Sequence, residues 1–173
     1  MTTTTIAYPS TSTVAATISL ASLASGSSGV FTSGRESAAI SNSSNDIDHI
    51  LRGVITTGTS PTAGRFIQVY AFIPRSIASG TATWPDTMTG SDAARSVTSS
   101  NVLFAALRLV ASWDVDSTSS RAYDFSGVSV ASLFGGAMPS KYGLYVAHDT
   151  GVALHATAGN HVISYERIQY QSA

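Results

Sequence analysis

The chain has 173 residues and a formal net charge of −1, and charged side chains occupy only 11% of its positions. This length predicts one domain with a buried core, and the charge content is about half of what globular proteins usually carry. The nine Lys and Arg residues are scattered singly, which argues against nucleic-acid binding because neutralising phosphates needs a basic stripe. The absence of cysteine excludes disulfide bonds and thiolate metal sites. So little surface charge is typical of a protein packed against others, or of one carried on a particle.

Residues 1–30 are rich in Ser, Thr and Ala, and we expect them to form an N-terminal arm before a domain of residues 31–173. Within the arm, residues 13–20 could form a strand because their large apolar side chains fall on one face. Those side chains are Val14, Ala16, Ile18 and Leu20. Two interpretations stay open: a flexible tail, or an arm that becomes ordered by adding to the sheet of a neighbouring subunit. The segment lacks the basic start of a secretion signal and the length of a membrane span, so we expect the protein to stay in the cytoplasm until assembly or release.

The middle of the chain predicts two strands joined by a turn. Residues 46–57 are enriched in β-branched side chains, and residues 65–73 suggest a strand buried over most of its length. Residues 58–64, between them, have the Gly, Ser and Pro content of a turn. Pro74 ends the second strand because proline cannot donate a hydrogen bond to a β-ladder.

Residues 74–100 form a long, weakly patterned insertion, and such connections are usually functional or disordered. Trp84 and Pro85 lie within it and are candidates for an exposed anchor that binds a partner. The alternative is a tryptophan folded back over the domain's own core, since tryptophan is common in both settings.

Residues 101–113 are ambiguous, because apolar residues three and four apart suit a helix while the alternation of the same segment suits a strand. We expect a strand, given the β-rich context, and we expect residues 128–134 to be either a strand end or one helical turn. The remaining strand candidates are residues 121–126, 143–148, 152–156 and 161–170. About eight short strands separated by turn residues predict an all-β fold, an antiparallel β-sandwich with a jelly roll as the expected topology.

The histidines do not form a convincing metal site. His148, His155 and His161 are close in sequence, but Asp149 is the only obvious further ligand nearby. We therefore expect separate surface imidazoles and no bound metal.

Two Asp-x-Asp pairs could in principle carry chemistry, namely Asp46 with Asp48 and Asp114 with Asp116. Each lacks the other oxygen ligands of a calcium loop, and nothing places either pair in a cleft suited to glycoside hydrolysis. The sequence also holds no Gly-x-Ser-x-Gly elbow and no Walker loop. We expect no enzymatic activity and no cofactor.

Two stretches resemble the small head decoration, or capsid-stabilising, virion proteins of tailed bacteriophages. The first is residues 41–72, in which residues 58–64 resemble the turn that joins two early strands of those proteins. The second is residues 130–159, whose recurrent features are Pro139, Lys141-Tyr142-Gly143 and Thr150-Gly151. With Trp84-Pro85-Asp86 between them, the resemblance spans roughly residues 36–171 and leaves out the N-terminal arm.

This resemblance implies a β-sandwich that binds the outside of an icosahedral capsid and reinforces the shell. The partners implied are the major capsid protein and other copies of the same chain in a small oligomer such as a trimer, with no nucleic acid and no membrane. The low surface charge is compatible with this function, because it lessens the desolvation cost of many repeated modest interfaces. As partner-binding residues we expect Val14, Ile18 and Leu20 of the arm, with Trp84 and Pro85 of the insertion.

Two other functions remain possible. The chain could be a tail or fibre component that binds a host surface polysaccharide, with Trp84, Tyr142 and Tyr145 exposed to stack on sugars. It could also be a polysaccharide-degrading enzyme, which would need a carboxylate pair such as Asp114 and Asp116 in a groove.

Overall fold

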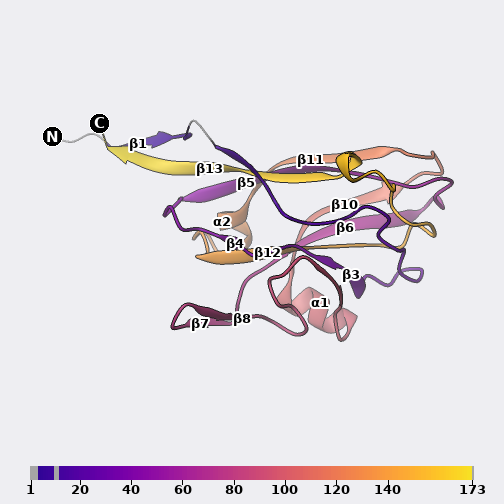
Figure 1. Cartoon of the computed structure of the whole chain (residues 1–173), viewed down its shortest axis with the longest axis horizontal. Helices are drawn as coiled ribbons and strands as arrows, with labels where there is room; N and C mark the ends of the chain where they lie inside the picture. The colour runs from indigo at the N-terminus through magenta and orange to yellow at the C-terminus, as the bar shows by residue number, and fades with distance from the viewer. Residues whose placement is uncertain (1–3, 10–11, 173) are drawn as a thin grey trace.

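The computed structural model describes residues 4–9 and 12–172, and two antiparallel sheets packed face to face form its body (Figure 1). In the first sheet the strand order is β1, β13, β5, β11, and β2 also pairs with β13. In the second the order is β10, β6, β12, β3, β9, and β4 also pairs with β12. The first sheet comprises β1 (Thr4–Ala7), β2 (Thr13–Ala15), β5 (Asp48–Thr56), β11 (Ala122–Ser129) and β13 (Val162–Ser172). The second comprises β3 (Ser33–Glu36), β4 (Ile40–Ser41), β6 (Arg65–Phe72), β9 (Ala93–Ser96), β10 (Arg108–Val115) and β12 (Lys141–His148).

The strand pairing is nested along the chain. β2 pairs with β13, β3 and β4 pair with β12, β5 pairs with β11, and β6 pairs with β10, all antiparallel. The pairing of β5 with β13 and of β6 with β12 completes the two sheets. This arrangement of eight strand positions is the jelly roll. The expectation of an antiparallel β-sandwich with jelly-roll topology is therefore confirmed.

The main core lies between the two sheets and follows from the alternation of apolar side chains along the strands. The first sheet contributes Leu51, Ile55 and Ile163, and the second contributes Ile67, Val69, Leu144 and Val146, all at most 2% exposed. Burying one such side chain stabilises the fold by about 1.5–3 kcal/mol. These strands are held in register because a slip of one residue would turn their apolar side chains into solvent.

A second core covers the outer face of the second sheet. Tyr70, Phe72 and Tyr145 point away from the first sheet and are packed under the connection between β6 and β10. Gly143 allows this packing, since a Cβ atom there would lie 2.4 Å from the ring of Phe72. Because both of its faces are covered, β12 is buried along nearly its whole length.

The connection that forms this cover runs from the end of β6 to the start of β10 and includes the insertion of residues 74–100 predicted from weak patterning. It contains the hairpin of β7 (Ser76–Ala78) and β8 (Thr81–Thr83), strand β9 and helix α1 (Ser100–Ala106). Its buried apolar residues are Met88, Val97, Leu103 and Leu107. The insertion is therefore neither disordered nor a free loop, and most of its apolar side chains serve the protein's own core.

The single strand expected over residues 101–113 is wrong for its first half. Residues Ser100–Ala106 form α1, and β10 begins at Arg108. The hydroxyl of Ser99 accepts a hydrogen bond from the backbone N–H of Val102 and so caps the helix. Leu103 and Leu107, four residues apart, then fall on the face that meets the second core.

The other short elements follow the sequence more closely. The alternative between a strand end and a helical turn at residues 128–134 resolves as both, since β11 ends at Ser129 and α2 spans Val130–Leu133. The 3₁₀ helix η1 (Ala158–Asn160) leads into β13. Residues 152–156 form no strand and contribute one isolated bridge, from Leu154 to Thr57.

The boundary expected at residue 30 does not coincide with a break in the structure. β2 pairs with β13 inside the first sheet, and Leu20 is only 2% exposed within the main core. The predicted alternation of residues 13–20 is present, but its apolar face is turned toward the chain's own second sheet. Of the described residues before residue 30, the segment around β1, at residues 4–9, lies apart from this core as an extended arm (Figure 1).

Candidate interaction surface

The C-terminal strand extends beyond the strand beside it. β13 pairs with β5 up to Ile168. In the described part of the chain, residues 169–172 then pair only with β1, in a regular register without a bulge. These two segments project from the sandwich at the end where both termini lie (Figure 1). We call residues 4–9, which include β1, together with residues 169–172 the ribbon.

Large apolar side chains of the ribbon are exposed to solvent. Ile6 is 63% exposed and Tyr170 is 65% exposed, and as direct cross-strand partners they share one face. Tyr8, which follows β1, is 62% exposed. All three border an open hollow of about 660 Å³ whose lining also includes the carboxyl residues Asp46 and Asp48. Large apolar side chains that lie together and exposed in this way mark an interaction site in a soluble protein.

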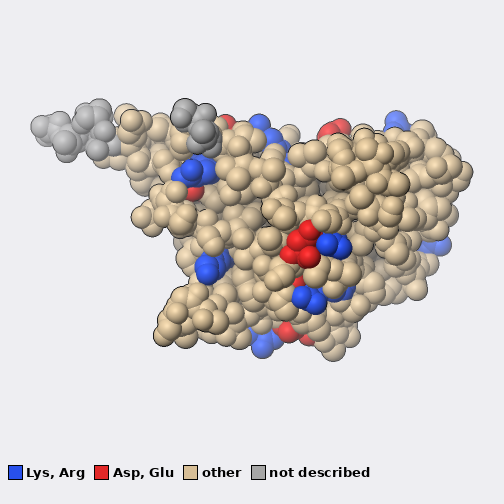
Figure 2. Space-filling view, viewed as in Figure 1, with Lys and Arg blue, Asp and Glu red and all other residues tan. Residues whose placement is uncertain are grey.

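The ribbon surface is also uncharged, since residues 4–9 and 168–172 contain no Asp, Glu, Lys or Arg. Elsewhere on the molecule, acidic and basic groups lie in contact with each other (Figure 2). Glu36 is fully buried and accepts hydrogen bonds from Arg95 and Thr89, and the carboxylate of Asp92 bonds Arg35 and Ser19. Many of the few charged side chains therefore pair with each other within the domain, and these are not free to bind a partner.

A buried polar cluster fastens the base of the ribbon to the sandwich. The carboxylate of Asp46 accepts hydrogen bonds from Arg167 Nε at 2.9 Å, from Gln169 and from His49 Nε2 at 2.9 Å. The Asp46 side chain is 3% exposed and that of Arg167 is 20% exposed. Burial alone would raise the pKa of Asp46, but hydrogen bonds from Arg167, His49 and Gln169 hold it below its ordinary value. We call Asp46, His49, Arg167 and Gln169, together with Tyr142, the Asp46 network.

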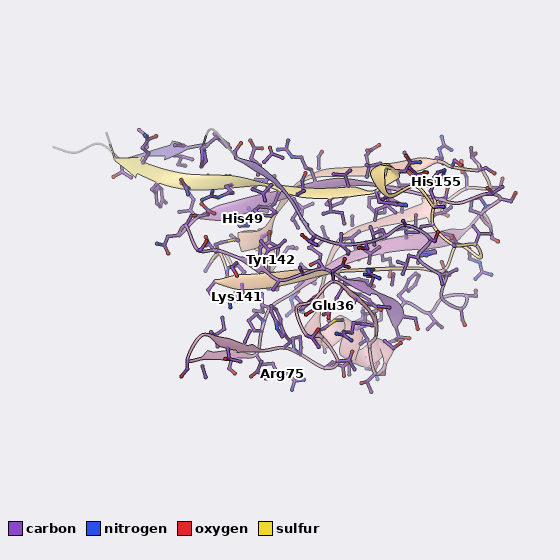
Figure 3. All side chains as sticks on the ribbon, viewed as in Figure 1. Glu36, His49, Arg75, Lys141, Tyr142 and His155 are labelled. Atoms are coloured by element: carbon purple, nitrogen blue, oxygen red, sulfur yellow. The ribbon has the colours of Figure 1, made fainter. Side chains whose placement is uncertain are left out.

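His49 connects this cluster to the second sheet. Because His49 Nε2 donates to Asp46, its Nδ1 accepts from the hydroxyl of Tyr142, 3.0 Å away on β12. Figure 3 shows both rings in the space between β5 and β12. Burial lowers the pKa of His49 and raises that of Tyr142, so both groups stay neutral at neutral pH. The ring of His49 also stacks on Tyr165 at 4.4 Å. Since His49 is 1% exposed and Tyr142 is fully buried, no substrate reaches this pair, and its role is structural.

The five residues expected to bind a partner are not gathered on a free surface. Leu20 and Pro85 are buried, while Val14, Ile18 and Trp84 are half-buried. Ile18 packs against the main core and Trp84 against the second core. The side chains of Leu20 and Pro85 lie away from solvent, because the apolar pattern that suggested a partner is satisfied within the chain.

Trp84 acts as a cover for the second core. Its ring lies edge-on to Phe72, with 5.4 Å between the ring centres, and it lies directly against Gly90. We expect Trp84→Ala to lower the free energy of unfolding by about 2–4 kcal/mol, since a large aromatic side chain is removed from a packed site.

Phe104, on the outside of α1, is the matched control for Trp84. It is 64% exposed, and we expect Phe104→Ala to change the free energy of unfolding by less than about 0.5 kcal/mol. Urea denaturation followed by far-UV circular dichroism measures both variants, since Trp84→Ala has lost one of the two tryptophans that fluorescence would report. If Trp84→Ala were as stable as Phe104→Ala, Trp84 would not cover the core and would be favoured as a partner-binding residue.

The aromatic platform expected for sugar binding is absent from the described surface. Tyr142 and Tyr145 are fully buried, one in each core, and Trp84 lies over Phe72. The sequence suggested exposed rings because it does not reveal that β12 is covered on both faces. The expected exposure of these three rings, which favoured a polysaccharide-binding tail or fibre protein, therefore no longer supports that alternative.

The expectation of surface imidazoles is wrong for two of the three C-terminal histidines. His148 is fully buried and bonds the Leu23 carbonyl and the Thr150 hydroxyl, each at 3.0 Å. His161 is 9% exposed and donates to the carbonyl of His155 at 2.8 Å. Burial lowers the pKa of both His148 and His161. Within residues 4–9 and 12–172, no three His, Asp or Glu side chains are placed to hold a metal ion.

The Asp-x-Asp pairs serve local structure. Asp48 accepts hydrogen bonds from the hydroxyl of Ser129 and from the backbone N–H of Ala131, which fixes the start of α2 against β5. Asp116 accepts from the backbone N–H of Thr118 in the turn between β10 and β11 and pairs with Arg121. The side chain of Asp114 is exposed on β10, an outer strand of the second sheet.

The residues that form the candidate surface, Ile6, Tyr8 and Tyr170, were not singled out by the sequence analysis. One signal was present: the alternation that begins at residue 161 continues as far as Tyr170. That signal could not reveal that the projecting end would be joined by residues 4–7 from the other end of the chain.

None of the described helices is long and apolar enough to cross a membrane. No known family model matches this chain, and no characterised protein shows significant sequence similarity to it.

Proposed function

We propose that this protein is a structural virion protein that binds the outer surface of a tailed-phage capsid and stabilises it, as a head decoration or cement protein. Its partners are the major capsid protein and other copies of itself. It is made in the host cytoplasm and carried on the exterior of the virion.

The observation that carries this proposal is the ribbon. A closed jelly roll needs no projecting two-stranded segment to bury its own core, and an isolated pair of strands is marginally stable in water. The ribbon nevertheless extends from the body with Ile6, Tyr8 and Tyr170 exposed and without charge. Such a surface suits a contact with another protein, because an uncharged apolar patch is desolvated at little cost.

The body of the protein supports the same proposal. Its sheets pack on each other and the second sheet is covered by its own connection, so the jelly roll is a self-contained unit. The resemblance of residues 41–72 and 130–159 to capsid-stabilising proteins falls on β5, β6, β12 and the turns around them. A cement protein binds at many equivalent positions, and modest contacts at each position add up over the shell.

Co-sedimentation of the purified protein with capsids that lack it tests the proposal. We expect stoichiometric binding and greater survival of the decorated capsids on heating. We expect the double variant Ile6→Thr/Tyr8→Thr to bind at least about tenfold more weakly, because it removes two exposed apolar contacts. The matched control is Phe104→Thr, which changes an equally exposed side chain on α1. If the wild-type protein does not co-sediment with capsids, the proposal fails. A glycan array would then test the tail or fibre alternative.

A further inference from the structure

The outer edge of β13 in the ribbon has an open set of hydrogen-bonding groups. Within the described chain, residues 169–172 pair with β1 on one side, while β5 ends its pairing with β13 at Ile168 on the other side. On that second side the backbone N–H of Ile47 still bonds the carbonyl of Ile168, and residues 169–172 pair with no described strand. An unpaired edge is a template for a further strand.

This edge lacks the features with which proteins block unwanted strand pairing. Charged side chains, proline and bulges are the usual protections. Residues 168–172 read Ile-Gln-Tyr-Gln-Ser and contain no charge and no proline, and the register with β1 has no bulge. An edge left in this state is suited to pairing rather than protected against it.

The chemistry of the edge indicates which strand it accepts. Two identical edges can pair antiparallel about a two-fold axis, because each then presents the same groups to the other. Like charges placed opposite each other would oppose such pairing, but residues 168–172 have none. The charged groups beside the edge are already bonded within the chain, since Asp46 pairs with Arg167 and Asp48 accepts hydrogen bonds from α2 and the residue before it. Electrostatic repulsion therefore does not oppose the pairing of two copies at this edge.

We propose that the free edge of β13 pairs with the same edge of a second copy of this chain across a two-fold axis. The two ribbons then form one four-stranded sheet in the order β1, β13, β13, β1. Tyr170 and Ile6 of both copies lie on one face of this sheet and double the apolar surface available to a larger partner. This inference deepens the proposed function by naming one contact between copies of the chain. It rests on the proposed function only in assigning that contact a use on the capsid.

The size of the contact sets its expected strength. Stable dimers bury about 800 Å² on each partner, whereas a ladder of about four residues covers much less. We expect a dissociation constant on the order of 100 µM, so that the protein dimerises at high concentration and on a crowded surface.

Charge placed at residue 171 tests the pairing. Gln171 is exposed, and alternation along the strand puts it on the face opposite Tyr170, so the apolar face is left intact. We expect Gln171→Lys alone and Gln171→Glu alone to weaken dimerisation at least about tenfold, because the two-fold axis brings like charges together. We expect an equimolar mixture of the two variants to restore it to within about threefold of the wild-type value. Sedimentation equilibrium from about 10 to 500 µM measures all four samples.

The outcomes separate this inference from the proposed function. A wild-type protein that stays monomeric at 500 µM, a trimeric mass, or a mixture of the two variants that fails to associate would overturn the two-fold pairing. A dimer that does not bind capsids would leave the pairing in place and overturn the decoration function. Capsid binding by a strictly monomeric protein would overturn the pairing and leave the decoration function in place.

Discussion

Replacement of Asp46 by Asn is expected to lower the free energy of unfolding by about 3 kcal/mol. Removing one partner of a buried ion pair leaves the other charge uncompensated, which typically costs 3–5 kcal/mol. The lower end applies because Arg167 keeps 20% of its side chain exposed and can be partly hydrated. The amide also keeps only one acceptor oxygen, so its NH2 group must face donors from His49 and Arg167 or from Arg167 and Gln169. Urea denaturation at pH 7 measures the loss.

Asp114→Asn is the matched control, since Asp114 has an exposed side chain on β10 and lies far from the ribbon in the sequence. We expect it to leave the free energy of unfolding close to the wild-type value. Hydrogen exchange adds a local measurement. If the Asp46 network fastens the ribbon, amides of residues 167–171 lose protection in Asp46→Asn and keep it in Asp114→Asn. Equal stability and equal protection in the two variants would contradict the assignment of Asp46 to this role.

The pH dependence of the same variant follows from the direction of the pKa shift. The folded protein holds the pKa of Asp46 below its ordinary value of 3.8. Its stabilising contribution is therefore complete above about pH 4 and is lost as the pH falls through the folded pKa. The difference in unfolding free energy between wild type and Asp46→Asn should shrink on acidification below pH 4. Other carboxyls with lowered pKa values, such as Asp86 and Asp92, are common to both proteins and cancel in this difference.

The regular strands of the sandwich could be predicted from the sequence because their signals are local. The segments that became β5, β6 and β13 show alternation or β-branched enrichment and are bounded by Gly, Pro, Ser or Asp. The segment that became α1 was missed although its signals were also local. Ser99 is a good N-cap and Leu103 and Leu107 have helical spacing, but the same residues also alternate as in a strand.

Partner choice between segments could not be predicted, since it depends on contacts across the whole chain. The alternation of residues 13–20 is correct, yet only the fold shows that β2 pairs with Ser164 to Glu166 of the same chain. The burial of Tyr142 likewise depends on His49 and Tyr165 from two other strands. The candidate surface exists because β13 continues beyond the end of its pairing with β5. The sequence of one strand does not determine how far it extends past its partner.

The second large effect concerns two deletions at the N-terminus. Removing residues 2–25 is expected to unfold the protein or to leave it without cooperative unfolding. This deletion takes away β2, the buried Leu20 and the core-facing Ala16, Ile18 and Leu23. At about 1.5–3 kcal/mol for each large apolar side chain, the loss approaches the whole stability of a typical domain, about 5–15 kcal/mol. The loss of far-UV circular dichroism and of a sigmoidal urea transition would show it.

Removing only residues 2–9 is the informative truncation, because it takes β1 and Tyr8 but leaves the main core covered. We expect the free energy of unfolding to change by less than about 1 kcal/mol, since chain ends contribute little to global stability. Capsid binding should fall at least about tenfold, because the ribbon loses Ile6, Tyr8 and one of its two strands. A cooperative transition at the wild-type urea midpoint after removal of residues 2–25 would contradict this account. It would mean that residues 13–20 are a detachable arm, and that the partner contact expected there from the sequence has to be sought again.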